Sequence, residues 1–229
     1  MKLSIIIPCY NEQSTIKEII NKINSQPDID KEIIVVDDCS VDKTKEILEN
    51  EIKESVHKII FNNQNYGKGY SIRKGIENSS GDYILIQDAD LEYDPSDYKK
   101  LLNPIIDGVA DVVYGSRFLG SSERRVLYFW HTVGNKFLTL FSNMLSNLNL
   151  TDMEVGYKVF KSSLLKEINL KEDRFGFEPE ITAKIAKKNI KIYEVGVKYF
   201  GRKYSEGKKI TWKDGFSAIR CIVKYNLFK

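Results

Sequence analysis

Two carboxylates separated by one residue follow an apolar stretch near the middle of the sequence. Asp88 and Asp90 come directly after residues 83–87, and Glu92 follows two positions later. Carboxylate oxygens are preferred ligands of Mg²⁺ and Mn²⁺, which are commonly shared with substrate phosphates. The spacing therefore predicts a metal site that neutralises a departing diphosphate. The same residues can also be solvated turn carboxylates, or cap a helix that starts at Pro95.

Four other apolar stretches are also followed by polar, acidic or glycine residues. These groups are Pro8-Cys9-Tyr10-Asn11-Glu12, Asp37-Asp38-Cys39-Ser40, Asn65-Tyr66-Gly67-Lys68-Gly69 and Gly115-Ser116-Arg117. The paired aspartates can accept hydrogen bonds from a base or a ribose, although Ser40 and Asp42 are also ordinary helix caps. The two glycines permit a close backbone approach and Lys68 adds a positive charge, but a surface turn explains them almost as well.

The elements that must position these groups alternate along the first half of the chain. Strands are expected over residues 3–7, 33–36, 56–61, 83–87 and 111–114, with helices after Ser14, near 43–52, around 70–78 and from Pro95. Ser14 is expected to cap a helix that buries Ile16, Ile19, Ile20 and Ile23. Such alternation predicts a parallel sheet with helices on both faces. Ligands then bind beyond the carboxyl ends of the strands, where all five groups would meet.

The second half is less regular. Helices are expected over residues 127–150, 178–189 and 214–225, and strands over 157–160 and 190–200. Leu138, Phe141, Leu145 and Leu148 form one helical stripe, which fits either core burial or a bilayer interface. No apolar stretch reaches the roughly 20 residues that cross a bilayer. We expect one domain over residues 1–229.

Composition narrows the class of protein. The 229 residues are 42% hydrophobic and 29% charged, which is too apolar for a disordered chain. A net charge of +3 gives no reason to expect a nucleic-acid partner. The charge is uneven, because residues 1–114 hold 13 basic against 21 acidic side chains and residues 115–229 hold 22 against 11. Three cysteines without a metal spacing favour reduced thiols and a cytoplasmic protein.

Several enzyme classes lack their motifs here. No G-x-G-x-x-G follows the first strand, which argues against a dinucleotide-dependent oxidoreductase. No G-x-x-x-x-G-K-[ST] or G-x-S-x-G is present, so P-loop enzymes and α/β-hydrolases are excluded as well. A nucleotidyltransferase needs a glycine-rich, Arg-bearing loop after the first strand, where this chain has Pro8-Cys9-Tyr10-Asn11-Glu12.

The ordered motifs resemble those of the family 2 glycosyltransferases. They run from Ile5-Ile6-Ile7-Pro8-x-Tyr10-Asn11-Glu12 through Val35-Val36-Asp37-Asp38-x-Ser40, Asn65-x-Gly67-Lys68-Gly69, Gly81-Asp82-Tyr83 and Asp88-Ala89-Asp90 to Gly115-Ser116-Arg117-Phe118. The branch with dolichol-phosphate mannose synthase and related polyprenyl-phosphate glycosyltransferases is most similar. The resemblance continues more loosely through Asp152-x-Glu154-x-Gly156-Tyr157-Lys158, Gly176-Phe177-Glu178 and the segment 201–209.

The resemblance implies a GT-A fold, Rossmann-like and mostly parallel, with a C-terminal helical extension on the acceptor side. Residues 1–118 would hold the nucleotide sugar and the metal, and residues 119–229 would hold the acceptor. The resemblance implies that the donor is bound by Pro8, Tyr10, Glu12, Asp37, Asp38, Gly67, Lys68 and Asp88. The Mg²⁺ or Mn²⁺ would be held by Asp88, Asp90 and Glu92. The phosphate would be bound by Arg202 and Lys208. Asp90 and Arg117 would act at the reacting centre, and Asp152 or Glu154 as a base if the acceptor is a hydroxyl.

The expected activity is metal-dependent, inverting transfer of a hexose from a UDP- or GDP-sugar to a polyprenyl phosphate or a cell-envelope glycan precursor. Two alternatives remain open: transfer to a hydroxyl of a soluble or polysaccharide acceptor, and a nucleotide-sugar-binding module without catalysis. Arg124 and Arg125 beside Tyr128-Phe129-Trp130, and a basic C-terminal half, also suit peripheral contact with the inner face of an anionic membrane.

Overall fold

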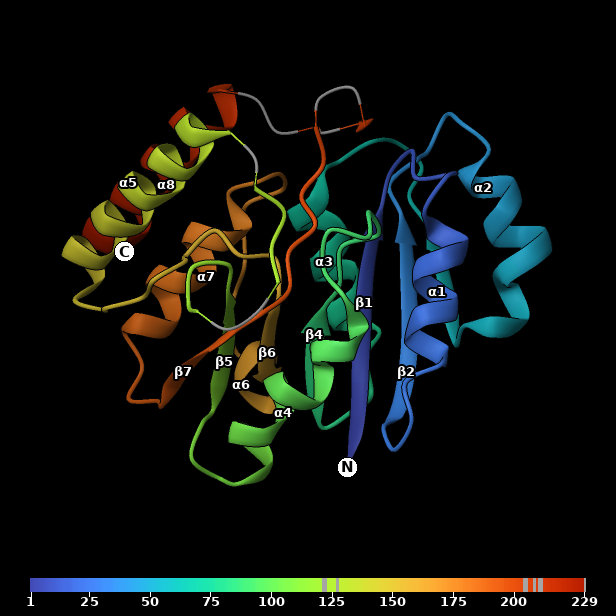
Figure 1. Ribbon diagram of the computed structural model, residues 1–229, viewed down its shortest axis with the longest axis horizontal. Coiled ribbons are helices and arrows are strands. Elements are labelled where there is room, and N and C mark those ends of the chain that lie inside the picture. The colour runs from blue at the N-terminus through green and yellow to red at the C-terminus, as the bar shows by residue number, and fades with distance from the viewer. Residues whose placement is uncertain (121–122, 127, 204–205, 208, 210–211, 229) are drawn as a thin grey trace.

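A seven-stranded sheet in the order β3-β2-β1-β4-β6-β5-β7 forms the centre of the molecule (Figure 1). The computed structural model describes residues 1–120, 123–126, 128–203, 206–207, 209 and 212–228. The strands are β1 (Lys2–Cys9), β2 (Asp30–Asp37), β3 (Lys58–Phe61), β4 (Tyr83–Ile86), β5 (Val112–Ser116), β6 (Lys158–Lys161) and β7 (Ile192–Gly196). Only β6 among these strands runs against its neighbours, β4 and β5. The expected mostly parallel α/β sheet is confirmed.

Helices cover both faces of this sheet, with α1 and α4 on one face and α3 on the other (Figure 1). The helices are α1 (Ile16–Asn24), α2 (Thr44–Ile47), α3 (Lys68–Glu77), α4 (Tyr98–Ile106), α5 (Phe129–Ser146), α6 (Ser162–Lys166), α7 (Phe177–Ala186) and α8 (Trp212–Leu227). Three shorter pieces are the π-helical turn Leu48–Ile52 and the 3₁₀ turns Lys53–Ser55 and Pro95–Asp97. The single helix expected near 43–52 therefore changes its hydrogen-bond pattern after four residues.

The apolar spacing of α1 determines how it packs. Ile16, Ile19, Ile20 and Ile23 are all buried against the sheet, as their spacing predicts. Each isoleucine removed from water contributes roughly 1.5–3 kcal/mol of transfer free energy. The cap expected at Ser14 was wrong. The helix begins at Ile16 without a side-chain cap, and the Thr15 hydroxyl donates to Glu12 instead.

The antiparallel direction of β6 determines which loop joins the sheet edge at which the parallel strands end. Strands β1, β2, β4 and β5 all end at one edge of the sheet, because they run in the same direction. An antiparallel strand begins where its parallel neighbours end. Residues 152–157, which precede β6, therefore join the groups that follow the parallel strands. The sequence placed this segment in the acceptor half without indicating its direction.

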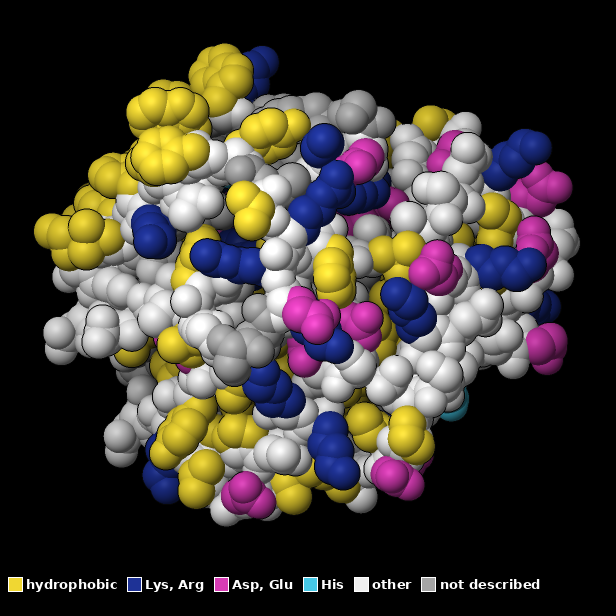
Figure 2. All heavy atoms as spheres, viewed as in Figure 1, with side chains coloured by type: hydrophobic (Ala, Val, Ile, Leu, Met, Phe, Trp, Pro, Cys, Tyr) yellow, Lys and Arg dark blue, Asp and Glu magenta, His cyan; other side chains and the backbone are white. Residues whose placement is uncertain are grey.

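Helices α5 and α8 pack against each other and against α7 at one end of the molecule (Figure 1). The stripe of Leu138, Phe141, Leu145 and Leu148 packs against the core, which confirms core burial for these side chains. Other apolar side chains of the two helices are exposed, and they form a cluster in Figure 2. They are Phe129, Trp130, Val133, Phe137, Leu140, Met144, Trp212, Phe216 and Leu227. Within the described residues, no helix combines the length and apolar character needed to cross a membrane.

Candidate active site

A cavity of about 1040 Å³ opens at the carboxyl edge of the sheet and brings most of the predicted site residues together. Its lining includes Pro8, Tyr10, Glu12, Asp38, Gly67, Lys68, Asp88, Asp90, Glu92, Arg117, Glu154 and Arg202. Asp37 and Asp152 are buried and do not line it. Lys208 lies outside the described residues. Segments that are 190 residues apart in sequence therefore meet in one place.

Asp38 holds the loop in front of α3. Its carboxylate accepts hydrogen bonds from the backbone N–H of Tyr66 at 3.0 Å and of Gly67 at 2.6 Å. Gly67 has a φ of 110°, and an added Cβ would collide with the backbone of Asp173 and Arg174. Glycine is therefore required here by conformation and by space. Asp37 instead accepts hydrogen bonds from the N–H and hydroxyl of Ser40, so it shapes the turn beneath this loop.

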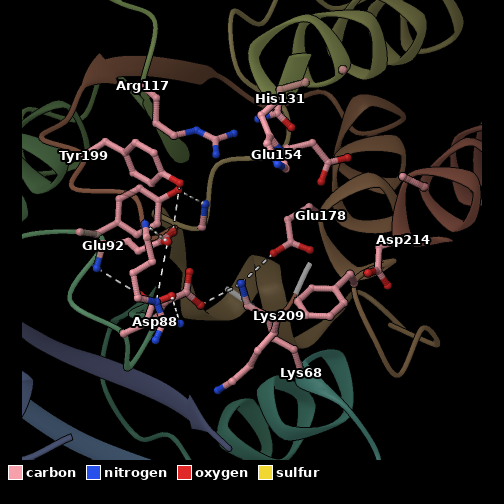
Figure 3. Close-up of a pocket in the computed structure, with 18 of the residues that line it drawn as sticks. Lys68, Asp88, Glu92, Arg117, His131, Glu154, Glu178, Tyr199, Lys209 and Asp214 are labelled. Atoms are coloured by element: carbon pink, nitrogen blue, oxygen red, sulfur yellow. Dashed lines mark hydrogen bonds and ion pairs between the residues drawn. The ribbon is translucent and has the colours of Figure 1, made fainter. Parts of the chain in front are cut away.

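Acidic and basic side chains alternate at the centre of the cavity (Figure 3). The Lys68 ammonium lies 2.8 Å from Asp88 and 3.0 Å from Glu178. The Arg202 guanidinium contacts Asp90 at 3.0 Å and Glu12 at 3.1 and 3.2 Å. Burial alone would lower the pKa of Lys68, but the two carboxylates raise it well above its ordinary value. Lys68 therefore stays charged and holds α3 to the end of β4.

The centre carries more negative charge than these cations offset. Burial raises the pKa of Asp90 to about 7, and the charges of Glu92 and Asp88 add to that rise while Arg202 opposes it. Hard oxygen donors with excess negative charge suit Mg²⁺ or Mn²⁺. Among the described residues, no three His, Cys, Asp or Glu side chains lie close enough to form a metal site alone. An ion bound by Asp88 and Asp90 would therefore take further oxygens from diphosphate or water, so the residues fit a shared metal.

Glu92 anchors the segment that follows β7. Its carboxylate accepts hydrogen bonds from the Tyr199 hydroxyl at 3.0 Å and from the Arg202 N–H at 2.7 Å. Its backbone carbonyl accepts a third bond, from the N–H of Phe200. Both carboxylate oxygens are thus engaged by protein donors. A metal-ligand role for Glu92 stays a prediction, and the structure shows it positioning Arg202.

Arg117 and Asp152 form a buried bidentate pair. The Nε and Nη2 atoms of Arg117 each lie 2.7 Å from an oxygen of Asp152, and the Arg117 N–H donates to the same carboxylate at 3.0 Å. Asp152 is fully buried, and the guanidinium also lies 5.2 Å from the ring of Tyr199. Planar bidentate pairing fixes the guanidinium in one orientation. Asp152 therefore holds Arg117 at the cavity wall and does not itself face the cavity.

Glu154 and Glu178 line the cavity beyond Asp88 (Figure 3). Among the described groups, Glu154 Oε1 and Glu178 Oε2 are buried and have no hydrogen-bond partner. Burial, together with the charge of Glu178, raises the pKa of Glu154. Lys158 is fully buried, its ammonium lies 4.7 Å from the ring of Tyr114, and burial lowers the pKa of this lysine.

Two residues of the site had no assigned role in the sequence analysis. Lys209 lies 2.6 Å from Glu12 and also donates to the carbonyl of Tyr10. Glu178 belongs to the Gly176-Phe177-Glu178 motif, which was noted without a function. In the sequence, Lys209 belongs to a basic run near the C-terminus, and Glu178 is a carboxylate in the first turn of an expected helix. Both patterns are common on solvated surfaces, so only the fold reveals that they face the cavity.

Comparison with known sequences decides the family. Residues 4–168 match the sequence profile of Glycosyl transferase family 2. The chain belongs to this family. The glycosyltransferase is 32% identical to the UDP-N-acetylglucosamine–dolichyl-phosphate N-acetylglucosaminyltransferase of Methanococcus voltae, over 93% of this chain and 91% of that protein. It is 28% identical to the dolichol-phosphate mannosyltransferase of Pyrococcus furiosus, over 92% of this chain but only 61% of that protein. The resemblance to the polyprenyl-phosphate branch is confirmed.

A solved structure supports the fold of the glycosyltransferase. The glucosyl-3-phosphoglycerate synthase of Mycobacterium tuberculosis, solved with Mn²⁺, UDP and phosphoglyceric acid, matches it with a TM-score of 0.75. The match covers all of this chain and 79% of that chain, at 18% identity. The expected GT-A fold is confirmed. The family match and the relatives named as glycosyltransferases confirm the expectation of an enzyme in place of a non-catalytic binding module.

Proposed function

We propose that the enzyme transfers a hexose-type sugar from a UDP- or GDP-sugar to a polyprenyl phosphate, with inversion at the anomeric carbon. One observation carries the proposal: a single cavity is lined both by the carboxylates Asp88 and Asp90 and by the aromatic side chains of Tyr128, Phe129 and Trp130. The acidic centre suits a metal–diphosphate, and the aromatic wall suits an isoprenoid chain. The names of the Methanococcus and Pyrococcus relatives support a dolichyl-phosphate acceptor.

In the proposed reaction, a phosphate oxygen of the acceptor attacks the anomeric carbon. A new carbon–oxygen bond forms as the bond to the diphosphate breaks, and the nucleoside diphosphate leaves with the bonding electrons. Attack opposite the leaving group inverts the configuration. Asp88 and Asp90 would hold the metal ion, which supplies positive charge to the leaving diphosphate. Arg202 and Lys209, which pair with Asp90 and Glu12, would bring two further positive charges to the diphosphate. Arg117, which lines the same cavity, would face the acceptor phosphate.

The acceptor determines whether a base is needed. A phosphate oxygen is already ionised at neutral pH, whereas a hydroxyl acceptor must lose its proton to a base. Asp152 is committed to Arg117, and Glu154 has a pKa raised by burial, which favours its protonated form. Both observations favour a phosphate acceptor over the hydroxyl alternative.

A partition assay tests this choice. The enzyme is incubated with radiolabelled UDP- and GDP-sugars, Mn²⁺ or Mg²⁺, and either dolichyl phosphate or the unphosphorylated alcohol dolichol. We expect organic-phase label with dolichyl phosphate alone. Label on dolichol at an equal rate would favour the hydroxyl alternative, and no label on either lipid with any donor would contradict the proposal.

We propose further that the exposed face of α5 and α8 rests on the membrane that carries the lipid acceptor. Phe137, Leu140 and Trp212 are 55%, 60% and 72% exposed, with Lys136 and Lys213 beside them. Apolar side chains next to basic ones are typical of helices that lie on anionic bilayers. This face is continuous with the aromatic wall of the cavity, because Phe129 and Trp130 belong to both.

Sedimentation with phosphatidylglycerol-containing vesicles tests membrane contact. Phe137 and Leu140 lie in the exposed face but outside the cavity lining, and each is replaced by glutamate (Phe137→Glu and Leu140→Glu). We expect each to reduce the bound fraction several-fold. Ile106→Glu replaces an equally exposed residue at the end of α4 and should leave binding unchanged. Equal effects of all three substitutions would contradict a specific membrane face.

A further inference from the structure

Two buried carboxylate oxygens of the cavity-lining residues Glu154 and Glu178 have no hydrogen-bond partner among the described residues. Glu178 is only 4% exposed, and its Oε1 accepts from Lys68 while its Oε2 has no partner among the described groups. Glu154 Oε1 is in the same condition. A buried polar atom without a hydrogen bond costs about 1–3 kcal/mol, so such atoms call for a ligand that donates to them. Figure 3 shows both side chains directed into the cavity.

Their position relative to the diphosphate site identifies which part of a ligand they meet. Lys68 contacts Asp88 and Glu178 with the same ammonium, so Glu178 lies one ammonium group away from the diphosphate centre. Asp38, the expected nucleotide-binding residue, accepts from the N–H of Gly67, which directly precedes Lys68. A nucleotide sugar bound with its nucleotide at Asp38 and its diphosphate at Asp88 would therefore place its sugar near Glu178, with Glu154 and Arg117 in the same cavity.

We propose that Glu154 and Glu178 bind hydroxyl groups of the transferred sugar, and that they select an uncharged sugar over a hexuronic acid. This inference rests on the proposed function. Sugar hydroxyls donate the hydrogen bonds that both carboxyl groups lack. A sugar carboxylate would instead meet Glu178 inside a site of low dielectric, where repulsion between like charges is strong. Unlike Asp88 and Asp90, these residues would contact only the sugar.

The sugar increment measures this contact. It is the ratio of the dissociation constant of a nucleoside diphosphate to that of the same diphosphate carrying a sugar. Titration calorimetry with UDP, UDP-glucose, UDP-N-acetylglucosamine and UDP-glucuronate, and with GDP and GDP-mannose, gives this ratio in the presence of Mn²⁺. In the wild-type enzyme we expect a ratio well above 1 for an uncharged sugar and no gain for glucuronate.

Glu178→Gln should lower the ratio for the uncharged sugar by about tenfold, the scale of one hydrogen bond to a charged group. Glu154→Gln should lower it by a smaller factor, because the raised pKa of Glu154 favours the uncharged carboxyl group. Binding of the nucleoside diphosphate alone should not change. Glu172→Gln is the matched control, since Glu172 also pairs with basic side chains, Arg220 and Lys224, but lies outside the cavity lining. It should leave both constants unchanged, and near-wild-type melting temperatures would show that the variants are folded.

Three results would overturn the inference: an unchanged sugar increment in both variants, an equal loss of UDP and UDP-sugar binding, or glucuronate bound as tightly as glucose. Each of these results leaves nucleotide binding by the wild-type enzyme intact, and with it the proposed function. Failure of every nucleotide to bind the wild-type enzyme would instead overturn the proposed function, and this inference with it.

Discussion

Removing the charge of Asp152 should destabilise the enzyme strongly, because it leaves a buried guanidinium without its counter-ion. Asp152 is fully buried and makes three hydrogen bonds to Arg117, whose side chain is 11% exposed. Breaking a buried pair by removing one partner costs about 3–5 kcal/mol. In a protein of this size, each kcal/mol shifts the melting temperature by about 2–4 °C. Asp152→Asn should therefore lower the melting temperature by roughly 6–20 °C.

Urea unfolding followed by circular dichroism measures this cost. Glu51→Gln removes the exposed pair between Glu51 and Lys17, which is equally short at 2.6 Å, and should cost less than about 1 kcal/mol. The double variant Arg117→Met with Asp152→Asn should be more stable than Asp152→Asn alone, because the unpaired charge is gone. A loss below about 1 kcal/mol for Asp152→Asn would refute the structural role assigned to this carboxylate.

Three further perturbations test other parts of the site. Asp90→Asn should lower transfer about 100-fold or more at saturating Mn²⁺, since losing about 3 kcal/mol of charge stabilisation has that effect; an active variant would refute the metal role. Gly156→Ala should also lower transfer, because the added methyl group would collide with Asp88 and Tyr93. The control Gly120→Ala meets no atom within 4 Å, lies outside the cavity lining and should keep full activity. The pKa of Glu154 is raised from 4.5 to about 8, so between these pH values the folded protein holds a proton that the unfolded chain releases. The free energy of unfolding therefore falls as pH rises from about 4.5 towards 8. Urea unfolding at pH 5.5 and 7.5 should show a smaller decline for Glu154→Gln, and an equal decline would contradict the raised pKa.

The structure of residues 1–118 could be predicted from sequence because each of its signals is local. Apolar strands ending in Pro8, Asp38 and Asp88 place those residues at one sheet edge, since parallel strands share a direction. The alternation of strands and helices along the chain was enough to predict that these strands are parallel. The strand bounds were correct to within two or three residues, and the spacing of the α1 isoleucines predicted its buried face.

The arrangement of residues 119–229 depends on contacts that sequence spacing does not encode. The direction of β6, which brings Glu154 to the site, follows from pairing with β4 and β5 and not from its own residues. The pairing of Arg202 with Glu12 joins segments 190 residues apart. The resemblance placed Asp152 among the catalytic residues, but only packing shows that its carboxylate is turned towards Arg117 and away from the cavity.

The anomeric configuration of the product tests the central claim most directly. Purified enzyme, dolichyl phosphate, Mn²⁺ and the donor with the largest sugar increment should yield a lipid-linked sugar phosphate, whose configuration proton NMR determines. The account predicts a configuration opposite to that of the donor, and transfer by Asp90→Asn that is slower by about 100-fold or more. A retained configuration, or a product formed equally well by Asp90→Asn, would contradict it.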